Sequence, residues 1–210
     1  ATLESKDFVE KNPENEKYGL GMKLFVIGNS IGEKIGLQKV IKPYAQRLHD
    51  EFNEAVNVSV LERSDGGAYH SVMIYKEENK QILGFNSDLG SRNECYCAGV
   101  GKCLLAFKDQ IDLSVYEKHP MKQYTERTIT TIDGLEKELE KVRRQGYAVD
   151  DEEQELGLTC IAVPIMKGST KQAIAAISLS GPTTRIKDST YETKIKRLME
   201  VGREISEKLK

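Results

Sequence analysis

The sequence lacks the features of a membrane protein and of a secreted one. No apolar run reaches the roughly 18 residues that a membrane-spanning helix needs. The first residues, from Ala1 to Lys11, are polar and charged, which does not suit a signal peptide. With 210 residues, 39% of them hydrophobic, the chain is long enough to bury a real core. These properties predict a cytoplasmic protein with one sizeable domain, or one domain and an appendage.

An excess of charge of one sign is also missing. The formal net charge is -2, so the chain as a whole has no electrostatic footprint for nucleic acid. Basic residues gather only near the C-terminus, where glutamates are interspersed among them, and this mixture is typical of a solvated helix face. These basic residues are Lys194, Lys196, Arg197, Arg203, Lys208 and Lys210.

Cysteine and histidine are few, and tryptophan is absent. The three histidines are scattered, so no Ser–His or Cys–His pair can be argued from spacing. Cys95, Cys97 and Cys103 lie close in sequence, and Cys160 is a candidate neighbour in space. Their C-x-C and C-x5-C spacings differ from the usual zinc motifs. Free thiols are therefore the favoured interpretation, with no catalytic residue, metal or cofactor assigned.

Hydrophobic periodicity predicts strands in hairpin-linked groups with helices between the groups. This pattern favours an α+β fold, a largely antiparallel sheet with helices packed on it. A capping box of Asp133 and Glu136 is expected to start a helix that ends at Gly146, and Pro43 is expected to kink or restart its helix. We predict strands near 7–10, 18–20, 56–60, 69–76, 81–85, 147–149, 159–165 and 175–182. A helix or linker is expected at 22–27 and a loop at 86–94, with helices at 37–52, 97–107, 133–146 and from 188 or 189.

Two apolar strands near the C-terminus carry small polar side chains. Ser178 and Ser180 stand two residues apart, so they point to the same face of one strand, and Cys160 lies on the other strand. Asp150 ends a neighbouring strand and opens an acidic run, 150–155, that is otherwise typical of a solvated loop. The pattern predicts a small polar spot within an apolar sheet, suited to orienting a small molecule.

The segment Gly99-Val100-Gly101-Lys102 opens a predicted helix. The N–H groups at a helix N-terminus favour a carboxylate or phosphate, and glycine allows close approach. The alternative is a helix start that uses its glycines for tight packing. A phosphate-binding P-loop is excluded, because Tyr96 stands where that motif needs glycine and Cys103 where it needs serine or threonine.

Taken together, these segments resemble the effector-binding domain of the IclR family of bacterial transcriptional regulators, over nearly the whole chain. The matching segments are Tyr18-Gly19-Leu20-Gly21, Gly99-Val100-Gly101-Lys102, Arg144-Gln145-Gly146-Tyr147-Ala148-Val149-Asp150-Asp151-Glu152-Glu153, Gly157-Leu158-Thr159-Cys160-Ile161-Ala162 and Ile177-Ser178-Leu179-Ser180-Gly181-Pro182. The last three, in this order and at these distances, make the resemblance specific.

The resemblance implies a GAF-like α+β domain, an antiparallel sheet flanked by helices, over residues 29–210. Residues 1–28 would be the remnant of a winged helix-turn-helix wing and a linker, with the DNA-reading helix before Ala1. It further implies a cytoplasmic regulator, not an enzyme, that binds a small organic effector, forms a dimer or tetramer, and contacts DNA only through the missing N-terminal domain and no membrane.

Carried over by position, the effector-binding residues of the family fall on two groups. Gly99 and Val100 would donate N–H groups to an effector carboxylate, and Phe85 and Leu89 would supply apolar walls. The other end of the effector would bind Asp150, Cys160, Ser178 and Ser180.

The chain departs from the family pattern at one place. Glu94-Cys95-Tyr96-Cys97 stands where many relatives carry Pro-Leu-His-Ala. Two alternatives therefore stay open: a cysteine-based redox enzyme on a GAF-like scaffold, and a zinc-binding sensor that uses Cys95, Cys97 and Cys160.

Overall fold

A computed structural model describes residues 2–35, 37–64, 66–78, 88–168, 170 and 172–209. The chain divides into two compact units, Ala1–Val40 and Ile41–Lys210, and each has its own sheet. No helix within the described ranges is long and apolar enough to cross a membrane.

The N-terminal unit contains the predicted β-hairpin. Its strands β1 (Val9–Lys11) and β2 (Tyr18–Leu20) pair antiparallel, after a short 3-10 turn η1 (Glu4–Lys6). A Cβ on Gly21 would lie 2.2 Å from the carbonyl oxygen of Asp7, so only glycine fits at the end of the hairpin. The helix that follows, α1 (Met22–Ile35), is longer than the predicted segment 22–27.

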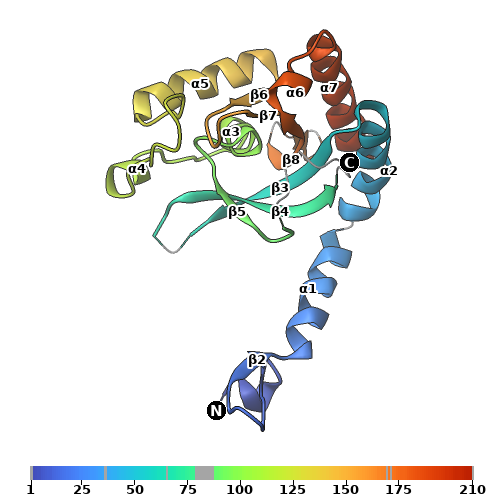
Figure 1. Cartoon of the computed structure of the whole chain (residues 1–210), viewed down its shortest axis with the longest axis vertical. Coiled ribbons are helices and arrows are strands. Elements are labelled where there is room, and N and C mark those ends of the chain that lie inside the picture. Colours follow the sequence, from blue (N-terminus) through green and yellow to red (C-terminus); the bar gives the residue numbers. More distant parts are fainter. Residues whose placement is uncertain are drawn as a thin grey trace. The chain divides into compact units, whose positions relative to one another are not determined.

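The C-terminal unit is built on a curled, six-stranded antiparallel sheet (Figure 1). Its spatial order is β5-β4-β3-β8-β7-β6, so β3 and β8 are central although more than 100 residues separate them in the sequence. The predicted α+β layout is therefore confirmed. The strands are β3 (Ala55–Arg63), β4 (Tyr69–Glu77), β5 (Arg92–Glu94), β6 (Ala148–Asp151), β7 (Leu158–Met166) and β8 (Ala173–Pro182).

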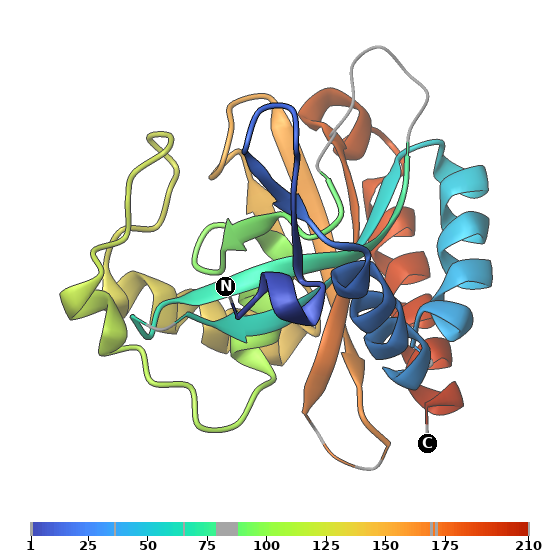
Figure 2. The same ribbon diagram turned by 90° about the horizontal axis from the view of Figure 1, so that it is seen from below.

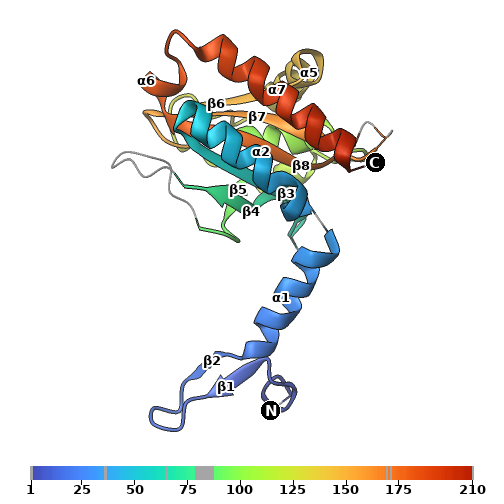
Figure 3. The same ribbon diagram turned by 90° about the vertical axis from the view of Figure 1, so that its right-hand side faces the viewer.

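Helices cover both faces of this sheet. The helices are α2 (Leu37–Phe52), α3 (Gly99–Ala106), α4 (Val115–Lys118), α5 (Ile132–Gln145), α6 (Thr183–Ile186) and α7 (Tyr191–Lys208). Helices α2 and α7 lie side by side on one face (Figures 2 and 3) and are joined by an ion pair between Arg47 and Glu204 at 2.9 Å. Helix α3 packs on the opposite face and α5 packs against α3, where a buried apolar cluster lies.

Helix α5 shows how local sequence fixes an element. Leu135, Leu139 and Val142 recur at helical spacing and are all buried. The predicted cap was wrong: the helix begins after Thr131, whose hydroxyl accepts from the N–H of Gly134 at 3.2 Å. The C-terminal signal was right, since Gly146 ends the helix in the left-handed conformation with φ 83°.

Three other predictions are corrected or fall outside the described residues. The predicted loop 86–94 ends in the edge strand β5, which pairs with β4. Lys194 was assigned to a solvated face but is 3% exposed, because its ammonium donates to the carbonyl of Arg185 and to Asp188 at 2.7 Å each. The predicted strand 81–85 lies outside the described residues.

Candidate ligand-binding site

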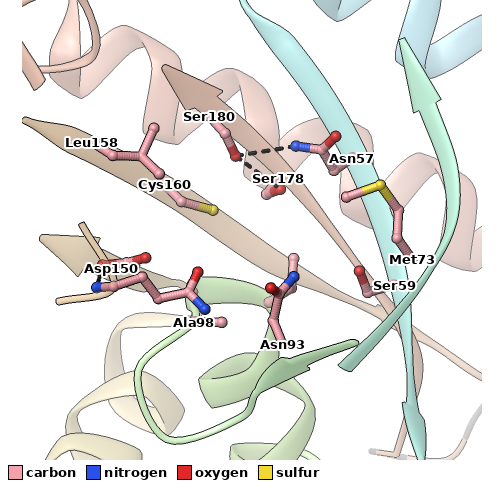
Figure 4. A pocket seen from close by; sticks show the side chains of 13 residues that line it. Asn57, Ser59, Met73, Asn93, Ala98, Asp150, Leu158, Cys160, Ser178 and Ser180 are labelled. Carbon is pink, nitrogen blue, oxygen red and sulfur yellow. Dashed lines mark hydrogen bonds between the residues drawn. The ribbon is translucent and has the colours of Figure 1, made fainter. Parts of the chain in front are cut away.

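Small polar side chains gather on the face of the sheet that α3 covers (Figure 4). Cys160 of β7 stands opposite Ser180 of β8. The hydroxyl oxygens of Ser178 and Ser180 lie 3.4 Å apart, and the side-chain N–H of Asn57 on β3 donates to Ser180 at 3.2 Å. The structure thus brings together the three residues for which strand alternation predicted a shared polar spot.

The N-terminus of α3 lies directly over this floor. A Cβ on Gly99 would meet the carbonyl oxygen of Cys160 at 3.0 Å and its sulfur at 3.2 Å. A side chain at this position would crowd β7, so glycine favours the close approach of the first turn. The N–H groups of Gly99 and Val100 belong to that first turn, where they have no partner within the helix. They carry the partial positive charge of the helix dipole to the edge of the pocket.

Asp150 closes the third side of the site. It is 2% exposed and stands opposite Cys160 in the pairing of β6 with β7. Its Oδ1 accepts from the N–H of Glu153 at 2.8 Å. Burial raises the pKa of Asp150 to about 7, and the neighbouring carboxylate of Glu153 adds to the rise, while this N–H bond and the ammonium of Lys102 oppose it. The group therefore titrates near neutral pH.

These side chains enclose a pocket of about 360 Å³ of atom-free space, part of it open to solvent. Six predicted site residues line it, whereas Leu89 is 60% exposed and outside the lining, and Phe85 lies outside the described residues. The lining consists of Asn57, Ser59, Met73, Asn93, Ala98, Gly99, Val100, Asp150, Gln154, Leu158, Cys160, Ser178 and Ser180.

Several lining residues were not singled out from the sequence. Asn57 and Ser59 alternate with Val56, Val58 and Val60, which predicts a half-buried strand with its polar side toward water. The structure buries both sides of the strand, with Asn57 at 5% and Ser59 at 1% exposure, because helices cover both faces of the sheet. The alternation of polar and apolar residues correctly indicated a strand. It did not reveal that the polar side of that strand would line a buried pocket instead of facing water.

A buried charge lies beneath the pocket. Lys102, the last residue of the Gly-x-Gly-Lys segment, is 0% exposed. Its ammonium donates to the carbonyl of Val149 at 2.6 Å and to the carboxylate of Glu153, and lies 3.7 Å from Glu138. This lysine ties α3 and α5 to the acidic segment that begins at Asp150. The sequence reasoning gave it no role.

The four cysteines are free thiols, and all are buried. Burial raises the pKa of each, to about 11 for Cys160 and further for Cys95, Cys97 and Cys103. A reactive cysteine needs a lowered pKa and access to solvent, so these environments give the redox alternative no support. Among the described residues, no group of three or more His, Cys, Asp or Glu side chains is arranged to hold a metal ion.

Comparison with known proteins places this chain in a family. Residues 30–207 match the family model described as bacterial transcriptional regulator IclR C-terminal. The chain belongs to the IclR family. It is 33% identical over 206 residues to the HTH-type transcriptional regulator KdgR of Escherichia coli K12, covering 98% of this chain and 76% of that protein. The IclR relatives are named as transcriptional regulators, not as enzymes.

Solved IclR structures share the architecture. The Thermotoga maritima IclR superimposes with a TM-score of 0.76 at 30% identity, covering 99% of this chain and 82% of that one. An IclR homolog from Microbacterium hydrocarbonoxydans has a TM-score of 0.80 at 22% identity, covering 99% and 82%, and this likeness shows the fold alone.

Proposed function

We propose that this chain is the ligand-sensing domain of an IclR-type regulator and that its pocket binds a small organic carboxylate. The observation that supports this most directly is the meeting of a helix N-terminus with a polar sheet floor. The N–H groups of Gly99 and Val100 would hold the carboxylate, while Asp150, Cys160, Ser178 and Ser180 would hydrogen-bond the rest of the ligand. All six of these residues line the same pocket, and this also supports the predicted site.

The charge balance of the pocket supports a ligand with one negative charge. A helix N-terminus stabilises an anion through several N–H groups and the helix dipole. Asp150 is the single ionisable carboxylate in the described lining, and with a pKa near 7 it is protonated in a large fraction of molecules at neutral pH. A protonated Asp150 donates a hydrogen bond to an anionic ligand instead of repelling it.

The homolog from Microbacterium hydrocarbonoxydans was crystallised in complex with 4-hydroxybenzoate. Its ligand is a small carboxylate, so a protein of this fold accommodates the class of molecule that we propose. The identity of 22% does not carry the ligand itself to this chain.

Membership of the IclR family suggests how ligand binding would control DNA binding. We propose that residues 1–28 are the end of a DNA-binding wing and a linker, that residues 29–210 form the effector-binding domain, and that two or more copies associate. KdgR is longer than the segment matched here, which covers 76% of it. A ligand that binds one arrangement of the assembled regulator more tightly than another shifts the population between them.

Ligand binding by this chain is the decisive experiment. We would screen it by thermal shift against aliphatic, sugar-derived, keto and aromatic carboxylates, each paired with its neutral amide. A ligand at 100 times its Kd adds about 2.7 kcal/mol to the free energy of unfolding, or several degrees in Tm. We expect a rise with at least one carboxylate and none with its amide. The proposal is wrong if no carboxylate raises Tm, or if acid and amide do so equally.

A further inference from the structure

The part of the pocket formed by β3 and β4 contains a buried hydroxyl group without a partner. Ser59 is 1% exposed, and its Oγ has no hydrogen-bond partner. A buried, unsatisfied polar group costs free energy, and Ser59 lines the pocket (Figure 4). A ligand group that exchanges a hydrogen bond with this hydroxyl would remove that cost.

The surroundings of Ser59 define the chemistry of that group. Asn57 is on the same strand, about 6.6 Å away by strand geometry, and Met73 is its partner on β4. Asn93 of β5 completes this end of the pocket. The lining at this end therefore has amide and hydroxyl groups, which both donate and accept, beside one apolar thioether.

A second carboxylate on the ligand would find no positively charged group among the described residues at this end of the pocket. The described lining contains no lysine, arginine or histidine, and its only charged side chain is the acidic Asp150. The nearby Lys102 is already bound to Glu153 and Val149. A buried carboxylate without a cation or an aligned helix N-terminus carries a large desolvation cost. The one helix N-terminus at the pocket is at Gly99, where the proposed function places the first carboxylate.

We propose that Ser59, Asn57 and Asn93 form a distal subsite that selects an uncharged hydroxyl group, so that the effector is a hydroxylated monocarboxylic acid. The proposal rests on the proposed function, because it takes the carboxylate to be at Gly99 and Val100. It assigns Ser59 the largest part in specificity, since its hydroxyl alone among the three is buried without a partner.

Two matched series of ligands test this subsite by isothermal titration calorimetry. The flexible series is hexanoate, 6-hydroxyhexanoate and adipate, and the rigid series is benzoate, 4-hydroxybenzoate and terephthalate. Within each series only the far end changes. It is methyl, hydroxymethyl or carboxylate in the flexible series, and hydrogen, hydroxyl or carboxylate in the rigid series. In a series that binds, we expect the hydroxy acid to bind about 3- to 10-fold more tightly than the plain acid, as one neutral hydrogen bond allows, and the dicarboxylate to bind most weakly.

The variant Ser59→Ala separates specificity from general binding. It should remove the preference for the hydroxy acid, because it weakens binding of the hydroxy acid much more than binding of the plain acid. Ser64→Ala is the matched control, because Ser64 lies just beyond the end of β3 with its hydroxyl on the carbonyl of Ala68, outside the pocket. It should retain the preference.

The possible outcomes distinguish the two proposals. If plain acids bind but hydroxylation brings no gain, or if Ser59→Ala weakens both acids equally, the distal subsite is wrong and the carboxylate sensor stands. Tighter binding of a dicarboxylate also overturns the subsite. If no member of either series binds and the broader carboxylate screen also fails, the proposed function fails, and the subsite fails with it.

Discussion

The ammonium of Lys102 donates to the carboxylate of Glu153 beneath the pocket, where the two residues are only 0% and 6% exposed. The backbone N–H of Glu153 in turn donates to Asp150, which lines the pocket. A buried ion pair therefore supports the position of a ligand-binding carboxyl group. Loss of Lys102 would leave the carboxylate of Glu153 buried without its cation.

Replacement of Lys102 by methionine should therefore destabilise the protein strongly. Breaking a buried pair from one side typically costs about 3–5 kcal/mol. The double variant Lys102→Met with Glu153→Leu should regain most of this loss, although the carbonyl of Val149 also loses its donor. Urea denaturation measures the free energy of unfolding of the single and the double variant. Lys141→Met is the control, since its exposed pair with Glu138 should contribute less than about 1 kcal/mol. Equal stability of the single and double variants would contradict this account.

Carboxylate binding should weaken as the pH rises through about 7. Below that value Asp150 is largely protonated and donates to the ligand, whereas above it the charged group repels the ligand. The affinity should fall by up to about tenfold for each pH unit above the pKa. Calorimetry between about pH 6 and about pH 8 tests this. Asp150→Asn keeps an oxygen acceptor for the N–H of Glu153 and should bind with little pH dependence; a slope that persists in this variant would place the titrating group elsewhere.

The same group affects stability in the unliganded protein. The folded pKa of Asp150, about 7, lies above the ordinary value of 3.8, so the native state binds the extra proton between these values. Stability should therefore fall as the pH rises from about 4 to about 7. Comparison of denaturation curves of the parent and Asp150→Asn isolates this contribution. The difference between them should change over that window and become constant above it.

Replacing two serines of the pocket by alanine should change the stability of the protein in opposite directions. Ser59→Ala removes an unsatisfied hydroxyl and should raise the stability of the empty protein, by about 1 kcal/mol or roughly 2–4 °C in Tm. Ser180→Ala removes the acceptor of Asn57 and should destabilise by a similar amount. Thermal unfolding without ligand measures both, and a loss of stability in Ser59→Ala would mean that its hydroxyl has a partner.

Ser180→Ala should also weaken ligand binding. A hydrogen bond between neutral groups, such as Ser180 and the uncharged part of the ligand, typically contributes about 0.5–1.5 kcal/mol, which corresponds to roughly two- to tenfold in Kd. Calorimetry with any carboxylate found in the screen measures the change. Ser114→Ala, an exposed serine outside the pocket, is the control and should bind as the parent does. Unchanged binding in Ser180→Ala would remove that residue from the site.

Part of the site could be predicted from local sequence. Side chains two residues apart share a strand face, so Ser178 and Ser180 had to point the same way once their strand formed. Glycines at 99 and 101 marked a helix start that approaches other backbone closely, and a Cβ on Gly101 would lie 2.4 Å from the Cα of Cys95. Strand alternation and the approach of Gly101 to Cys95 are short-range constraints, whereas the approach of Gly99 to Cys160 depends on the tertiary fold.

The sequence by itself therefore determined most of the strand and helix segments, the glycine-bearing helix start and the polar face of β8, because each depends on neighbours within a few residues. Tertiary structure decided the rest. The pairing of β3 with β8 turned Asn57 and Ser59 from an expected solvent face into pocket walls. The packing of α3 on β6 and β7 buried Lys102 against Glu153. Burial and partner choice depend on contacts between distant segments, and no local pattern encodes which of those segments will meet.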